Sequence, residues 1–171
     1  MLLVKEGGNM CEKLPNNMTI DAVFDKYCDT VYRLAFARTK NRFDAEDVLQ
    51  TVFLKLIKTD TAFTDEEHLK AWLLKVTVNN SKNLLNSAWV RLTTGMRDDI
   101  TISLVATTEV YSVVAGLPIK YRTVIHLHYY EGYSCVEIAE ILGTKEATVK
   151  TRLFRAREKL QTQLKGVGFD V

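Results

Sequence analysis

The chain has 171 residues, of which 47% are hydrophobic and 26% charged, and its formal net charge is +2. This size and apolar content suffice for a buried core, which excludes a disordered tail, a collagen-like repeat and a small disulfide-stapled domain. Only two Pro and eight Gly are present, and long segments are rich in Leu, Ala, Lys and Glu. Because these residues favour helices, we predict an all-α protein.

Cysteine spacing and hydropathy bear on three features: disulfides, metal sites and membrane insertion. Cys11, Cys28 and Cys135 lie far apart, without the spacing of metal ligands, so neither a disulfide framework nor a metal site is predicted. No apolar run approaches the roughly 20 residues that a membrane helix needs. We expect a cytoplasmic protein without membrane insertion and without a cofactor.

Residues 1–19 form an N-terminal extension whose composition differs from the rest. Lys5-Glu6-Gly7-Gly8 is what a ribosome-binding sequence of the AAGGAGG type would encode in this frame, and Met10 follows two codons later. One hypothesis is therefore that translation starts at Met10 and that the upstream residues are a wrongly assigned leader. An ordinary disordered terminus is the alternative.

Helical periodicity predicts two small helical domains joined by a short linker. The first spans residues 20–92 and the second residues 109–165, followed by a tail at 166–171. Residues 93–108 between them are rich in Thr and β-branched residues and lack an amphipathic stripe, although a short helix there is an alternative. Fully extended, sixteen residues reach about 50 to 55 Å, which would allow the two domains to bind separate DNA elements.

Charge is unevenly distributed along the chain. Residues 21–67 contain seven Lys/Arg and ten Asp/Glu, whereas residues 68–97 contain five Lys/Arg and no acidic residue. Residues 144–165 contain seven Lys/Arg and two Glu. Two basic blocks in a nearly neutral chain indicate two surfaces that face phosphates, and two solvated helix faces are the alternative.

The clearest local pattern lies near the C-terminus. Ser134 and Glu137 have the spacing of a capping box, which predicts a helix start, and Gly143 predicts its end. Thr144 is the expected cap of the next helix, whose apolar positions recur at three- and four-residue spacing up to Leu160. Two helices joined by a tight glycine turn form a helix-turn-helix.

The opposite face of this second helix mixes cations with hydrogen-bonding groups, which suits phosphates and base edges in a DNA major groove. Its members are Lys145, Thr148, Lys150, Thr151, Arg152, Arg155 and Arg157. A generic helical hairpin with a basic face is the alternative.

These residues carry a family resemblance. The stretch GLPIKYRTVIHLHYYEGYSCVEIAEILGTKEATVKTRLFRAREKL resembles region 4 of bacterial sigma factors, in particular the extracytoplasmic-function (ECF) group. Upstream, FDKYCDTVYRLAFARTKNRFDAEDVLQTVFLKLIK followed by HLKAWLLKVTVNNSKNLLN resembles region 2 of the same family. The resemblance implies a factor that binds core RNA polymerase, at the clamp of the largest subunit and at the flap, and directs initiation at minus-ten and minus-thirty-five elements. It also implies an anti-sigma partner.

The resemblance assigns the segment DAEDVLQTVFLKL to polymerase binding. The expected contact residues are Asp44, Glu46, Asp47 and Gln50, although Thr51 stands where the family usually has Glu. Asp44 also predicts an N-cap, and an apolar stripe at Val48, Leu49, Val52, Phe53 and Leu56 predicts core positions.

The acid-free block matches the helix by which the family reads the minus-ten strand, together with the preceding loop at about residues 59–67. The expected DNA contacts are Lys75, Asn79, Asn80, Lys82 and Asn83, because an Asn amide can pair with a base edge and Lys with phosphate. Solvated amides at a fraying helix end are the alternative. Trp89 is the main aromatic outside the expected core, so we expect melting at few, well-matched promoters.

In the second helix of the helix-turn-helix, Lys150, Thr151, Phe154 and Arg155 match the family positions that meet the minus-thirty-five element, and Arg152 and Arg157 are expected phosphate contacts. Phe154 could instead pack against the preceding helix.

Enzymatic functions fit the sequence poorly. His68, His126 and His128 lack partners at ligand spacing, and no phosphate-binding glycine loop or nucleophile elbow occurs. The alternative function is a stand-alone helix-turn-helix transcriptional regulator, which would not need an acidic polymerase-binding helix.

Overall fold

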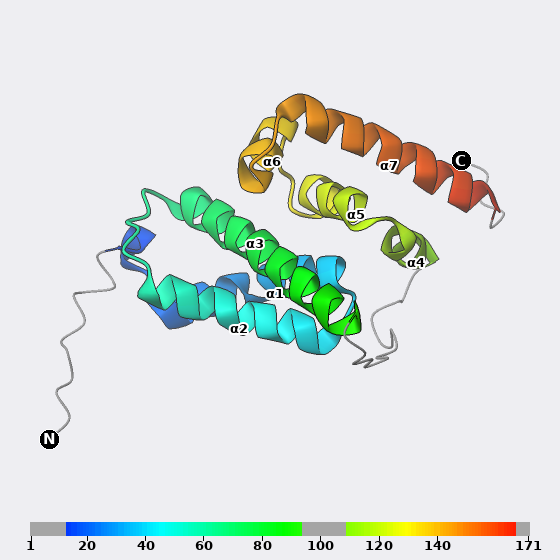
Figure 1. Ribbon diagram of the computed structural model, residues 1–171. Coiled ribbons are helices and arrows are strands. Elements are labelled where there is room, and N and C mark those ends of the chain that lie inside the picture. The colour runs from blue at the N-terminus through cyan, green and yellow to red at the C-terminus, as the bar shows by residue number, and fades with distance from the viewer. Residues whose placement is uncertain (1–12, 94–108, 167–171) are drawn as a thin grey trace, which may run out of the picture.

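The computed structural model describes residues 13–93 and 109–166, and within these ranges it is helical without strands. Residues 1–12 of the N-terminal extension, which include the proposed leader upstream of Met10, lie outside the described residues, as do the linker after Thr93 and the tail after Gly166. Figure 1 shows the helices in two groups, α1 to α3 below and α4 to α7 above. The all-α fold predicted from composition is confirmed.

The N-terminal unit is built from a 3-10 turn and three helices, which pack around one core. Their bounds are Pro15–Asn17 for η2, Ile20–Thr39 for α1, Arg42–Lys58 for α2 and Glu66–Thr93 for α3. Residues 13–19 pack onto this unit, since Leu14 is buried and the backbone N–H of Phe63 donates to the carbonyl of Lys13 at 2.9 Å. The apolar stripe predicted on α2 is confirmed, with Leu49 partly buried and the other positions buried.

The start of α2 differs from the sequence prediction. Asn41, not Asp44, is the N-cap, and its side chain accepts from the backbone N–H of Asp44 at 3.1 Å. Asp44 therefore lies in the first turn, where its negative charge favours the positive end of the helix. The earlier start arises because Lys40 adopts a left-handed conformation that ends α1 and places Asn41 at the corner.

The C-terminal unit contains a short helical segment followed by the helix-turn-helix. Its elements are α4 (Glu109–Gly116), α5 (Ile119–Ile125), the π-helical turn η3 (His126–Tyr130), α6 (Cys135–Leu142) and α7 (Glu146–Gly166). Both halves of the capping box at Ser134 are present, and Gly143 is left-handed at φ 59°. The predicted helix-turn-helix is confirmed. Its second helix, α7, begins at Glu146, whereas an N-cap at Thr144 would have started it one residue earlier.

The two units are packed against each other. One core cluster contains Leu34 of α1 and Leu74 and Val78 of α3 together with residues of α5, α6 and α7. Helix α5 contacts α1, and α6 contacts α3. The sequence indicated two helical units but gave no sign of this shared core.

Candidate nucleic-acid interface

Helix α7 has one buried face and one polar face. Val149, Leu153 and Ala156 are buried against α5 and α6, as their spacing predicts. Phe154 lies on the opposite side with 61% of its surface exposed, so it does not pack against the preceding helix. An exposed aromatic ring among cations is costly in water and useful against a base or a thymine methyl group.

The cations on α7 occupy different positions around the helix. Lys150 forms an ion pair with Glu146 at 2.7 Å, and this hydrogen bond raises the pKa of Lys150. Arg157 turns away toward η3, where its Nε donates to the hydroxyl of Tyr129 at 2.7 Å. Arg157 is therefore engaged with η3, whereas Thr151, Arg152 and Arg155 line the side of α7 that faces α5.

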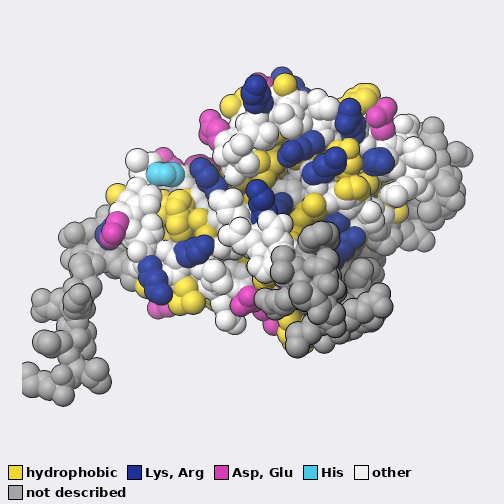
Figure 2. All heavy atoms as spheres, viewed as in Figure 1, with side chains coloured by type: hydrophobic (Ala, Val, Ile, Leu, Met, Phe, Trp, Pro, Cys, Tyr) yellow, Lys and Arg dark blue, Asp and Glu magenta, His cyan; other side chains and the backbone are white. Residues whose placement is uncertain are grey.

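A shallow hollow of about 360 Å³ separates α7 from the start of α5. Figure 2 shows Lys and Arg side chains gathered over this part of the molecule. The lining residues are Lys120, Tyr121, Ala147, Thr148, Thr151, Arg152 and Arg155. Three cations around a hollow form a site for phosphate oxygens. Sequence reasoning missed Lys120 because it lies outside both basic blocks, and only the packing of α5 on α7 brings it to this surface.

Helix α3 carries the second group of predicted contacts. Lys75, Asn79, Lys82 and Asn83 are exposed. Asn80, in contrast, is buried, and its Oδ1 accepts a hydrogen bond from Lys55 Nζ of α2 at 2.6 Å. Asn80 therefore holds α2 against α3 and does not share the exposed face with Asn79 and Asn83.

Helix α2 presents the predicted acidic face. Asp47 and Gln50 are exposed, whereas Asp44 and Glu46 are half-buried, and Glu46 accepts from Arg42 Nε at 2.8 Å. Sequence reasoning missed that this face is also apolar. Phe43, Leu54 and Ile57 are all exposed, and the spacing 43, 47, 50, 54, 57 places them with Asp47 and Gln50 on one stripe. An exposed apolar stripe edged by charge is typical of a docking surface for a protein.

The described residues contain no group of three or more His, Cys, Asp or Glu side chains that could hold a metal ion. None of the helices in the described ranges is long and apolar enough to cross a membrane.

Comparison with known proteins assigns both units. Residues 23–91 match the family model described as Sigma-70 region 2, and residues 107–160 match the model described as Sigma-70, region 4. The chain is 33% identical over 141 residues to the RNA polymerase sigma factor SigV of Bacillus subtilis, covering 78% of this chain and 83% of the relative. It is 30% identical over 163 residues to the ECF RNA polymerase sigma factor SigW of the same species, covering 84% and 87%.

The chain belongs to the ECF group of RNA polymerase sigma factors. It is therefore a promoter-directing initiation factor that acts with core RNA polymerase and promoter DNA, and a stand-alone regulator is not favoured. The family is generally non-enzymatic.

Solved structures share the fold of this sigma factor. The sigma factor RpoE of Bartonella quintana, in complex with the anti-sigma factor NepR, matches with a TM-score of 0.73 at 22% identity, covering 85% of this chain and 96% of that one. CnrH in complex with the cytosolic domain of CnrY matches with a TM-score of 0.63 at 23% identity, covering 86% and 88%.

Proposed function

We propose that this sigma factor binds its partners through three exposed faces, one each on α2, α3 and α7. The observation that carries the proposal is that each of these helices keeps a full apolar face in a core and still exposes a second, chemically distinct face. Folding alone does not require these second faces, so binding is their natural use.

Helix α7 is the face for duplex DNA. Thr151, Phe154 and Arg155 would meet base edges of the minus-thirty-five element, while Arg152 and Lys120 hold phosphates at the hollow. Phosphate contacts fix the register and base contacts give specificity, at about 1 to 3 kcal/mol for each good pair. Arg157, oriented by Tyr129, would hold a phosphate next to η3.

Helix α3 is the face for the melted minus-ten strand. Lys75 and Lys82 supply positive charge, and Asn79 and Asn83 supply amides that can pair with unstacked bases. The loop before α3, which ends at Asp65, lies next to the beginning of this face.

The stripe on α2 is the face for core polymerase. Asp47 and Gln50 would give polar contacts to the clamp, and Leu54 and Ile57 would give buried apolar area. The C-terminal unit would contact the flap. The chain would work in the cytoplasm, by binding alone and without a catalytic step, and an anti-sigma factor would hold it inactive.

Run-off transcription with purified core polymerase on a library of random promoters tests the proposal. Wild type should start transcripts at a shared two-part motif. Asp47→Arg should abolish initiation, because a cation replaces the exposed carboxylate on the polymerase face, and Arg155→Ala should weaken selection of the upstream motif alone.

Two exposed residues of α1 provide matched controls. Asp25→Arg and Arg33→Ala repeat the charge changes away from the three faces and should leave initiation unchanged. If wild type binds duplex DNA but starts no transcript with core polymerase, the chain is a stand-alone regulator and the proposal is wrong.

A further inference from the structure

A short stretch of the N-terminal extension is built into the N-terminal unit. Leu14 and Pro15 are buried, and Leu14 belongs to the same core as α1, α2 and α3. The next two residues, Asn16 and Asn17, are left-handed, with φ of 55° and 52°. Left-handed backbone is uncommon outside glycine, and asparagine is among the residues that tolerate it best. The packing of residues 13–15 therefore holds a sharp turn in place.

These residues contact the loop that joins α2 to α3, residues 59–65. The backbone N–H of Phe63 donates to the carbonyl of Lys13 at 2.9 Å, and the Phe63 ring is buried beside Trp72. Lys13 Nζ also forms an ion pair with Asp60 at 2.8 Å, although an exposed pair of this kind contributes little on its own. Figure 1 shows the blue N-terminal turn beside the loop that leads into α3. The middle of the loop is thus tied to the extension.

The end of the loop is held at Glu66, the first residue of α3. Asn16 Nδ2 donates to Glu66 Oε1 at 3.2 Å. Lys26 Nζ and the Tyr27 hydroxyl, both of α1, donate to the other carboxylate oxygen. These hydrogen bonds, that from Lys26 above all, outweigh desolvation and hold the pKa of Glu66 below its ordinary value. Glu66 is therefore a carboxylate at neutral pH, and it accepts from both the extension and α1.

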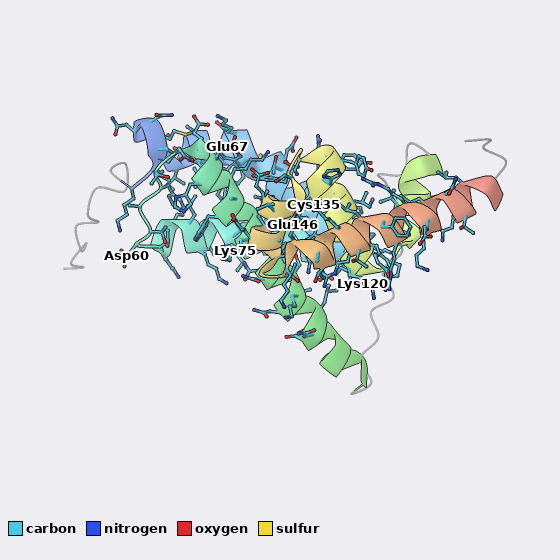
Figure 3. The ribbon with its side chains drawn as sticks, turned by 90° about the horizontal axis from the view of Figure 1, so that it is seen from above. Asp60, Glu67, Lys75, Lys120, Cys135 and Glu146 are labelled. Atoms are coloured by element: carbon cyan, nitrogen blue, oxygen red, sulfur yellow. The ribbon has the colours of Figure 1, made fainter. Side chains whose placement is uncertain are left out.

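The opposite side of the loop is exposed and adjoins the strand-binding face of α3. The two neighbours of Phe63, Ala62 and Thr64, are both exposed. Lys75, a cation of the strand-binding face, lies about 14 Å from the start of α3 at 1.5 Å per residue. Figure 3 labels Asp60 on the loop and Lys75 on the helix that follows it. A single strand that lies along α3 would therefore reach the exposed side of the loop.

A loop that selects a base needs a fixed shape. A mobile loop adjusts to several bases and discriminates poorly between them, as flexible binding surfaces do in general. Ordering such a loop on binding also costs conformational entropy. A loop that is already ordered avoids this cost and cannot adapt to the wrong base.

We propose that residues 13–16 are positioning residues, which fix the loop between α2 and α3 so that its exposed side selects one base of the melted minus-ten strand. Lys13 and Leu14 hold the middle of the loop, and Asn16 holds its end. They act through the loop and not by touching DNA. This inference rests on the role of α3 proposed above, because that role places the strand next to the loop.

Hydrogen exchange at the Phe63 amide, measured by NMR, tests whether residues 13–15 hold the loop. This N–H donates to Lys13, so it exchanges when that contact opens. Leu14→Ala in the full-length chain removes the buried anchor and should speed the exchange about tenfold, and Leu14→Met should restore protection because it refills the same space. Val48→Ala is the matched control, since it shortens a buried side chain of the same core about 15 Å along α2 from the loop.

Run-off transcription with core polymerase measures base selection. The promoter is the motif selected from the random library, substituted one base at a time. Leu14→Ala should lower the preference at one minus-ten position about fivefold and leave the preferences in the minus-thirty-five element unchanged. Leu14→Met should restore the wild-type preference. Val48→Ala should leave every base preference as in wild type, even where lower stability reduces total initiation.

A second variant leaves the core intact. Lys13→Ala combined with Asn16→Gly removes the side-chain contacts with Asp60 and Glu66, and glycine accepts the left-handed backbone at position 16 without strain. It should shift the preference at the same minus-ten position in the same direction, by about twofold. Because it shortens no side chain of the core, it tests the inference even if Leu14→Ala does not fold. Circular dichroism checks the helix content of each variant.

Two results would overturn this inference alone. Unchanged exchange at Phe63 in Leu14→Ala would show that residues 13–15 do not hold the loop. Base preferences that stay as in wild type in both variants would show that the segment only adds stability.

An arm on α3 separates these failures from a failure of the proposed function. Asn79→Ala combined with Asn83→Ala removes the two exposed amides of the strand-binding face. If this variant leaves every minus-ten preference unaltered, α3 is not the strand-binding helix, and both proposals fall. If it alters a preference and the variants of residues 13–16 do not, only the present inference is wrong.

Discussion

Asn80 and Asn83 lie three residues apart on α3 and have the same side chain, yet only one of them is available to DNA. Asn80 is buried and accepts a short hydrogen bond from Lys55, whereas Asn83 is exposed. Both match a pattern of polar residues in a basic helix, and sequence alone treats them alike. Which amide faces α2 is decided by the rotation of α3 against its neighbour, which local sequence does not encode.

We therefore expect substitution of Asn80 to lower stability and substitution of Asn83 to weaken DNA binding. Asn80→Ala should lower the free energy of unfolding by about 1 to 3 kcal/mol, because Lys55 loses its acceptor and a small cavity remains. Asn83→Ala should change stability by less than about 0.5 kcal/mol and weaken binding of single-stranded DNA. Urea denaturation and fluorescence anisotropy measure the two effects. Equal loss of stability in both variants would contradict the assignment of Asn83 to the exposed face.

Elements defined by local interactions were predictable from the sequence. The capping box at Ser134, the left-handed turn at Gly143 and the apolar stripe of α2 each depend on residues within two helical turns of one another. The N-cap of α2 was placed at Asp44 instead of Asn41, because both residue types cap well and the left-handed Lys40 that decides between them has no sequence signature.

The capping box gives a prediction at the scale of α6. Ser134→Ala should cost about 1 kcal/mol of stability, because its hydroxyl no longer accepts from the backbone N–H of Glu137. Hydrogen bonds from Ser134 lower the pKa of Glu137. The carboxylate's contribution is therefore complete above the ordinary glutamate pKa and is lost as pH falls through the lowered value.

The same box can be tested by titration. The stability difference between wild type and Glu137→Ala, measured by urea denaturation, should shrink as the pH is lowered from about 6 to about 3. Glu140→Ala removes an exposed carboxylate from the same helix without removing a cap, and it is the matched control. A pH-independent difference for Glu137→Ala would show that the carboxylate does not hold the start of α6.

At the scale of the whole molecule, sequence reasoning identified two units and missed how they join. Leu34 and Leu74 lie in ordinary amphipathic stripes, and nothing within a few residues of them or of Arg122 indicates that their partners are about 40 to 90 positions away. These contacts depend on the tertiary packing of helices that are distant in the sequence. For the same reason Lys120 could not be assigned to the phosphate hollow, although α7, which forms one side of it, was predicted as the second helix of the helix-turn-helix.

A hydrogen bond from Arg38 Nη1 of α1 to Thr123 Oγ1 of α5, at 2.6 Å, joins the two units. Its contribution to stability can be tested by substitution. Arg38 is 8% exposed, and burial, together with the nearby charge of Arg122, lowers its pKa to about 10. A buried cation with few partners depends strongly on each acceptor. Thr123→Val should therefore cost about 1.5 to 3 kcal/mol in the wild-type chain, because a charged donor loses its partner without a large change in volume.

The cost should largely disappear when Arg38 is absent. In an Arg38→Met background no charge is left unpaired, so Thr123→Val should be nearly neutral, and Arg38→Met itself can be mild because it removes a buried cation. The double-mutant cycle, measured by urea denaturation of the full chain, should give a coupling of at least about 1 kcal/mol. A coupling near zero would mean that the Arg38–Thr123 hydrogen bond does not help to hold the units together.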